Sequence, residues 1–210
     1  ACLAGAMLLG TAGIRRRGTT AADPAHARLG YTFALLTGVF FLAAVAGLTA
    51  LSQAAGIVQA YGGGAALAVG ATTFLTGAVG AARIGGGWLV DHFTPARVGI
   101  GAHALSLAGA LLLALVPGPA TAAIALALIG IGYGIVSGLA AGAIAQYWDA
   151  RAFGYVASRL YIAWCAAAVS LPVMAGALFD RTGSYAAAIW MAVGINALGI
   201  VIARRLPARA

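Results

Sequence analysis

Long runs of apolar residues alternate along the chain with short breaks that are polar or rich in glycine and proline. Six of the runs are long enough to cross a bilayer, at residues 30–57, 65–90, 98–116, 121–147, 153–179 and 185–202. The breaks between them read YGGG, DHFTPAR, PGP, WDAR and DRTGS, which are typical turn sequences. Since a spanning helix needs about 20 apolar residues, the pattern predicts six transmembrane helices.

Composition supports this interpretation. The 210 residues are 63% hydrophobic and only 8% charged, whereas a soluble domain carries about 25% charged residues. The net charge of +8 would suggest a nucleic-acid partner in a soluble protein. Here the arginines gather at the ends of the apolar runs, as membrane topology requires. We therefore expect an all-α polytopic membrane protein whose partner is the lipid bilayer, with no nucleic acid bound.

The beginning of the chain predicts a different organisation from the rest. Residues 1–14 form an apolar run too short to span, and three arginines follow it. A signal peptide has its positive charges before the apolar part, so this order argues against one. We expect residues 1–14 to end a truncated transmembrane helix, residues 15–29 to form a cytosolic linker between two halves, and residues 30–210 to form a six-helix unit.

The distribution of arginines predicts the orientation. If six helices alternate, the linker, the two loops near residues 91–97 and 149–152 and the C-terminus share one side. That side carries nine arginines, and the opposite side carries only Arg181. The nine are Arg15, Arg16, Arg17, Arg28, Arg97, Arg151, Arg204, Arg205 and Arg209. The positive-inside rule places this side and the C-terminus in the cytosol, and we expect a plasma membrane of the bacterial inner-membrane type.

Two charged residues fall inside the predicted spans, and Arg83 is the deeper one. It lies eight residues before Asp91, which corresponds to about 12 Å of helix. A charge at such a depth costs about 2.5–3.5 kcal/mol by insertion scales, so Arg83 is expected to face protein or water. The alternative is a side chain that snorkels to the interface. For Arg159, nearer the cytosol, snorkelling or a gate contact is favoured over substrate contact.

Other side chains in the spans have less specific interpretations. Most serine and threonine hydroxyls in membrane helices bond their own backbone or a neighbouring helix. His103 is either a proton relay or a structural histidine. Cys2 and Cys165 lie in apolar segments and are expected to be small buried hydrophobes. The glycines of residues 130–142 predict close helix packing. We find no hydrolase, P-loop or metal motif, and expect neither enzyme activity nor a metal or cofactor.

The stretch RIGGGWLVDHF, residues 83–93, resembles the loop signature G-x-x-x-D-[RK] of the major facilitator superfamily. That signature lies between the second and third helices of each half of such a carrier. Residues 15–29 resemble the linker between the halves, and VMAGALFDRTGSY, residues 173–185, resembles the end of the eleventh helix. The resemblance implies the C-terminal half of a carrier whose N-terminal half is missing from this chain.

Within the superfamily the chain is most similar to the oxalate/formate antiporter group and related monocarboxylate carriers. Residues 46–57, AGLTALSQAAGI, resemble that group's seventh helix, and residues 147–164 resemble its eleventh-helix start. The resemblance implies that Arg83 binds the substrate carboxylate. Trp164 stands where oxalate carriers have a lysine, which favours a monocarboxylate over a dicarboxylate. His92 replaces the usual basic residue after Asp91.

We therefore expect a secondary transporter of a small organic anion, with a monocarboxylate as the first choice, that works by alternating access. The expected substrate-binding residues are Arg83, Trp164, Thr76 and Tyr161, and the expected gating residues are Asp91, Arg97 and Arg159. An exporter of a drug or another metabolite is the alternative within the superfamily, and would be expected to carry an acidic residue deep in a helix. A membrane enzyme or sensor without transport would need a buried nucleophile–base pair or a metal set.

Overall fold

A computed structural model describes residues 29–208 of the chain. The predicted helix end at 1–14 and all but the last residue of the predicted linker lie outside the described residues, as do Cys2 and Arg209. The described part is helical throughout, with short turns between its helices. Its elements are α2 (Gly30–Ala60), α3 (Ala65–His92), α4 (Pro95–Leu115), α5 (Pro119–Tyr147), the 3-10 helix η2 (Ala150–Ala152), α6 (Phe153–Ala168), α7 (Leu171–Thr182) and α8 (Ala186–Ala203).

The six predicted spans are confirmed. Six helical segments of the described part are long and apolar enough to cross a membrane, when the continuous stretch Ala150–Thr182 is taken as one. Three of the predicted boundaries fit closely, because Gly64, Thr94 and Gly118 precede α3, α4 and α5. Thr94 caps α4 by accepting a hydrogen bond from the backbone N–H of Arg97 at 3.4 Å.

The fifth span is not the single helix that the sequence predicted. It breaks at Val169 and Ser170 into α6 and α7. Pro172 explains the break, because a proline lacks a backbone N–H and its ring clashes with the carbonyl four residues earlier, here that of Ala168. The Ser170 hydroxyl and backbone N–H both bond the carbonyl of Ala167, at 2.8 and 3.2 Å. This span is therefore a discontinuous helix.

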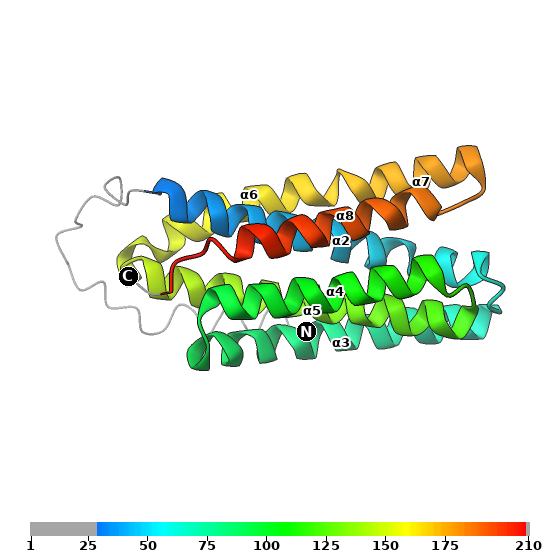
Figure 1. Cartoon of the computed structure of the whole chain (residues 1–210), viewed down its shortest axis with the longest axis horizontal. Helices are drawn as coiled ribbons and strands as arrows, with labels where there is room; N and C mark the ends of the chain where they lie inside the picture. The colour runs from blue at the N-terminus through cyan, green and yellow to red at the C-terminus, as the bar shows by residue number, and fades with distance from the viewer. Residues whose placement is uncertain (1–28, 209–210) are drawn as a thin grey trace, which may run out of the picture.

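The helices run along one long axis, with α5 as the central member of the bundle (Figure 1). Helix α5 packs against α3, α4 and α2, and α4 also packs against α8. Helices α4 and α8 lie side by side at the front of Figure 1, and α3 and the α6–α7 pair lie at its lower and upper edges. The spans of α3 and α6–α7 have the smallest buried share. They are the helices with most surface left to pack against something else.

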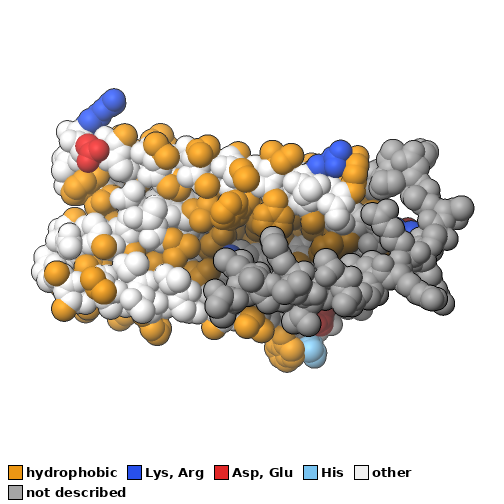
Figure 2. Space-filling model, turned by 180° about the vertical axis from the view of Figure 1, so that it is seen from behind, with side chains coloured by type: hydrophobic (Ala, Val, Ile, Leu, Met, Phe, Trp, Pro, Cys, Tyr) orange, Lys and Arg blue, Asp and Glu red, His pale blue; other side chains and the backbone are white. Residues whose placement is uncertain are grey.

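Charged side chains of the described part lie mainly at the two ends of the bundle. One end carries the four arginines Arg97, in the first turn of α4, Arg151, in η2, and Arg204 and Arg205, just after α8. Arg181 lies at the other end. Figure 2 shows basic and acidic side chains at one end of the bundle and many hydrophobic side chains on the surface between the ends. At the arginine-rich end the Tyr147 hydroxyl donates to the Pro207 carbonyl at 2.7 Å, which ties the C-terminal segment to α5. Successive spans run in opposite directions, so these four arginines lie at the same end of the bundle.

Glycines of α5 let α3 approach its backbone closely. A Cβ atom at Gly134 would lie 2.6 Å from the Val79 carbonyl oxygen, and one at Gly138 would overlap the Arg83 carbonyl oxygen. A matching close approach occurs at Gly86 of α3, against the backbone of Ile135. The prediction that glycines in residues 130–142 serve helix packing is confirmed.

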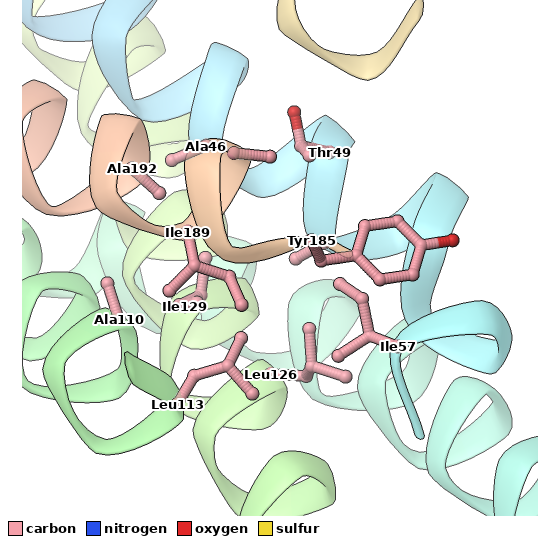
Figure 3. A pocket seen from close by; sticks show the side chains of 12 residues that line it. Ala46, Thr49, Ile57, Ala110, Leu113, Leu126, Ile129, Tyr185, Ile189 and Ala192 are labelled. Atoms are coloured by element: carbon pink, nitrogen blue, oxygen red, sulfur yellow. The ribbon is translucent and has the colours of Figure 1, made fainter. Parts of the chain in front are cut away.

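A small, partly open apolar pocket lies between α2, α4, α5 and α8 (Figure 3). It has a volume of about 20 Å³, enough for one water molecule at most. Its polar neighbours are few, since the Thr49 hydroxyl already donates to the Val45 carbonyl at 2.7 Å. This pocket is therefore too small and too apolar to hold an organic anion.

Candidate functional site

Arg83 lies deep in the membrane span of α3. It comes nine residues before the last residue of α3, which places its Cα about 14 Å from that end and roughly 7 Å from the helix midpoint. A hydrocarbon core about 30 Å thick therefore includes this position. Arg83 is exposed, and it forms no hydrogen bond or ion pair with any other residue of the described part. Its guanidinium group thus has no partner among residues 29–208.

The backbone around Arg83 is held firmly, although its side chain has no partner within the described part of the chain. Its neighbours Val79 and Gly86 are buried against α5. The backbone N of Arg83 would lie 3.3 Å from a Cβ at Gly134 of α5. Since the two helices touch through backbone atoms here, the Cα of Arg83 has a fixed place beside this turn of α5.

Thr76 lies two helical turns before Arg83 on the same side of α3, because seven residues correspond to nearly two turns. It is exposed, and its hydroxyl donates to the Thr72 carbonyl at 2.9 Å. Thr72 and Thr73 donate in the same way to the carbonyls of Ala68 and Val69. These hydroxyl protons are used within α3, so the threonines offer oxygen lone pairs rather than donors.

Trp164 of α6 is joined to α5 by a side-chain hydrogen bond. Its indole Nε1–H donates to the Tyr133 hydroxyl at 2.7 Å. Tyr133 is buried, and its ring occupies space above Gly47 of α2, where any Cβ would overlap it. Because Tyr133 precedes Gly134, Arg83 and Trp164 approach the same turn of α5, from α3 and from α6. The spacing of Tyr133 and Trp164 along the sequence does not indicate this contact.

Tyr161 and Arg159 have neighbours of their own. Tyr161 is 53% exposed, and its ring meets that of Phe40 edge-on with centroids 5.7 Å apart. The Arg159 guanidinium lies over the Tyr155 ring, 3.5 Å from its centroid, and donates to the Tyr155 carbonyl at 3.3 Å. Arg159 is thus engaged one turn back in its own helix, and its predicted gating role stays a prediction.

Asp91 and Arg97 flank the turn between α3 and α4. Both are exposed, and the described part shows no ion pair between them. His92 is instead bonded to its own helix, with Nδ1 2.9 Å from the Trp88 carbonyl oxygen and the two rings 4.3 Å apart. The gating role of Asp91 with Arg97 is therefore a prediction that does not rest on a contact formed in this conformation.

A polar network closes the opposite end of the bundle. The Tyr185 hydroxyl donates to the Gln53 Oε1 at 3.2 Å, and Gln53 Nε2 donates to the Pro172 carbonyl at 3.3 Å. Burial raises the pKa of the Tyr185 hydroxyl, and nearby Asp180 raises it further. Tyr61 donates to the Leu113 carbonyl at 2.8 Å, and burial raises its pKa as well. Both phenols are therefore neutral donors that join helices.

The described residues hold no cluster of three or more histidine, cysteine or acidic side chains that could bind a metal. Cys165 is a free thiol. It is exposed on α6, so the expectation of a buried small hydrophobe was wrong for this residue. The sequence could not reveal this, because the apolar run around Cys165 does not show which side of the helix is covered.

No family model matches the chain, and no curated protein matches it. Among solved structures, the chain is similar to one described as the crystal structure of a mutant of the peptide transporter POT. The two share 21% sequence identity with a TM-score of 0.71, over 84% of this chain and 38% of the transporter chain. The match thus covers well under half of the transporter. It shows a shared fold: an integral membrane bundle of six apolar spans, arranged like one part of a transporter.

Proposed function

We propose that this chain is the C-terminal half of a secondary transporter of the major facilitator type that moves a small organic anion, with a monocarboxylate as the preferred substrate. The observation that carries the proposal is the guanidinium of Arg83, deep in an apolar span and without a partner among residues 29–208. The shared fold with part of a transporter supports the proposal that the chain belongs to a carrier. The substrate class rests on the chemistry of the site.

A carboxylate is the ligand that Arg83 suits best. Guanidinium stays charged at all physiological pH values and can grip a carboxylate through two parallel hydrogen bonds. At a separation of about 4 Å and an effective dielectric constant of about 20, the pair gains about 4 kcal/mol. This attraction offsets the cost of about 2.5–3.5 kcal/mol of placing an arginine at such a depth, and the cost of removing the carboxylate from water reduces the net gain. An anion would therefore turn a costly residue into a binding site.

The charges of the described spans favour an anion over a cation. All three aspartates of the described part, Asp91, Asp149 and Asp180, are exposed near helix ends. A carrier for organic cations would be expected to hold an acidic residue deep in a helix. One deep arginine balances a single carboxylate, and no second cation stands at Trp164.

The aromatic residues of α6 suit the apolar part of such a substrate. The indole N–H of Trp164 already donates to the Tyr133 hydroxyl. The rest of the indole can therefore offer only apolar contact. Tyr161 is exposed on the same helix, one turn earlier. We propose that these side chains pack against the hydrocarbon part of the monocarboxylate while Arg83 holds its charge.

The discontinuous fifth span supports alternating access. Broken helices near the binding site recur in secondary transporters, because they let one part of a helix move relative to the other. The break at Val169 and Ser170 lies on the same span as Trp164, about one to two turns further along the chain. Movement at this break would change the position of Trp164 relative to α7.

Uptake by the complete carrier in proteoliposomes tests the proposal. The panel contains labelled formate, acetate and lactate, oxalate as a dicarboxylate, and an organic cation. We expect uptake of at least one monocarboxylate, and little uptake of oxalate or the cation. Arg181→Ala, at the other end of the bundle, is the matched control and should transport normally. Uptake of the cation without any carboxylate would contradict the proposed substrate class.

A further inference from the structure

His103 is a buried titratable side chain that the proposed transport site does not use. It lies in α4 and is only 1% exposed. Its Nδ1 lies 3.1 Å from Oδ1 of Asn196 in α8, and its Nε2 lies 3.2 Å from the Val39 carbonyl oxygen in α2. One imidazole therefore connects three membrane helices, through both of its nitrogens.

The amide of Asn196 has a fixed orientation. Its Nδ2 donates to the Ala192 carbonyl at 2.8 Å, one turn back in α8. A flipped amide would place Oδ1 against that carbonyl, and two oxygens that can only accept would face each other. Oδ1 must therefore point toward His103, and it can only accept a hydrogen bond there.

Both nitrogens of His103 thus face an acceptor. A neutral imidazole has one N–H and one lone pair, so it can satisfy only one of these neighbours. If the proton sits on Nδ1, the Nε2 lone pair faces the Val39 carbonyl. If it sits on Nε2, the Nδ1 lone pair faces the Asn196 amide oxygen. Only the imidazolium form donates from both nitrogens and makes both contacts.

We propose that His103 is a proton-binding site that joins α4 to α2 and α8. With the proton bound, both hydrogen bonds form and the three helices are held in the arrangement described above. When the proton leaves, one of the two contacts becomes repulsive and the packing of α4 against α2 or α8 loosens. The ligand of this site is a proton, and the proposal does not depend on the identity of the transported substrate.

No other charged group shares this site among the described residues. The charged residue of α4 itself is Arg97, six residues earlier, or about 9 Å along the helix. Helix α8 carries no titratable side chain, and in α2 the titratable residue is Tyr31, near the helix start. Helix α5 presents Tyr133, whose hydroxyl accepts from Trp164, and Tyr147, whose hydroxyl donates to the Pro207 carbonyl at the helix end. Burial away from water opposes the charge, so the two oxygen acceptors, Asn196 Oδ1 and the Val39 carbonyl, are the groups that have to stabilise it.

The backbone of α8 comes close to the imidazole of His103. A Cβ atom at Gly199 of α8 would overlap the His103 ring. His103 lies eight residues after the start of α4, about 12 Å from the arginine-rich end of the bundle. Because the ring is enclosed, a proton exchanges only when α4 and α8 separate slightly, so proton binding and helix packing are coupled.

Nitrogen NMR of the complete carrier tests the protonation directly. Because the complete carrier is longer than this chain, the histidine-labelled carrier is compared with its His103→Gln variant, and the signals that the variant loses are those of His103. Near pH 5–6 we expect both ring nitrogens to carry protons, with two hydrogen-bonded N–H signals. A single neutral tautomer that persists from pH 5 to pH 8 would overturn the proposal.

Thermal unfolding of the carrier across the same pH range is the second measurement. Since the folded form holds the proton, its stability is greatest at low pH and falls as pH rises and the proton is lost. We expect Tm to fall by roughly 2–6 °C between pH 5 and pH 8. His103→Gln should remove most of this slope, and His92→Gln, on an exposed histidine, should keep it. An equal slope in His103→Gln and the unchanged carrier would contradict the proposal.

Discussion

Gly134 sets how closely α3 approaches α5 next to Arg83, so Gly134→Ala tests whether this close approach matters. The new Cβ would lie 2.6 Å from the Val79 carbonyl oxygen and 2.7 Å from the Ala82 Cβ. The shorter separation is about 0.8 Å below the 3.4 Å at which ordinary contact begins. Val79 and Ala82 both belong to α3, whose backbone touches α5 here. Helix α3 would therefore have to move away from α5, together with Arg83.

The expected cost follows from this overlap. Overpacking of this kind costs about 1–3 kcal/mol, whereas a glycine-to-alanine change in an open helix position gains roughly 0.5–1 kcal/mol. Gly77→Ala is the matched control, because Gly77 lies in α3 two residues before Val79, and an added Cβ there would have nothing within 4 Å. The two variants should therefore differ by about 1.5–4 kcal/mol in stability.

Thermal unfolding of the purified carrier measures the difference, with substrate uptake recorded in parallel. We expect Gly134→Ala to unfold several degrees below the unchanged carrier, and Gly77→Ala to unfold at the same temperature or slightly above it. Uptake should fall in Gly134→Ala because the guanidinium of Arg83 is displaced. Equal unfolding temperatures for the two variants would refute the packing argument.

Three further predictions concern the site and the topology. Tyr133→Phe removes the acceptor of the Trp164 indole, which should cost about 0.5–1.5 kcal/mol of stability and raise the KM for uptake more than it lowers the maximal rate; an unchanged KM would argue against a positioning role. Asp91→Asn should slow transport while leaving equilibrium substrate binding nearly intact, and unchanged turnover would dismiss the gating role. In a cysteine-free carrier, an impermeant thiol reagent added outside should label Gly183→Cys and not Ala96→Cys, and labelling at position 96 would reverse the orientation.

The six spans could be predicted from the sequence because lipid imposes a simple length rule on apolar helices. Turn residues such as Gly64 and Thr94 marked the helix starts closely. The break within the fifth span was harder to recognise. Pro172 was visible, but a proline in a membrane helix either kinks the helix or ends it. Only the surrounding contacts decide between these outcomes, and here the Ser170 hydroxyl bonds backward and completes the break.

The site was only partly predictable. Arg83 is conspicuous because a charge is rare in an apolar run, and the structure places it without a partner in the described part. The bond between Trp164 and Tyr133 joins residues 31 positions apart, and their spacing carries no periodic signal. The same holds for His103, whose partners lie 64 and 93 residues away. Contacts between distant helices depend on how the bundle packs, which a hydrophobic pattern does not specify.

Equilibrium binding of a transported monocarboxylate to the purified carrier tests the counter-charge role of Arg83 most directly. Arg83→Ala should abolish measurable binding while expression and folding persist, because the carboxylate loses its only deep cation in the described part. Arg83→Lys should retain weak binding, since it keeps the charge and loses the planar pair of hydrogen bonds. Arg181→Ala should bind as the unchanged carrier does. Normal binding by Arg83→Ala would contradict the account and leave Arg83 as a packing or topology residue.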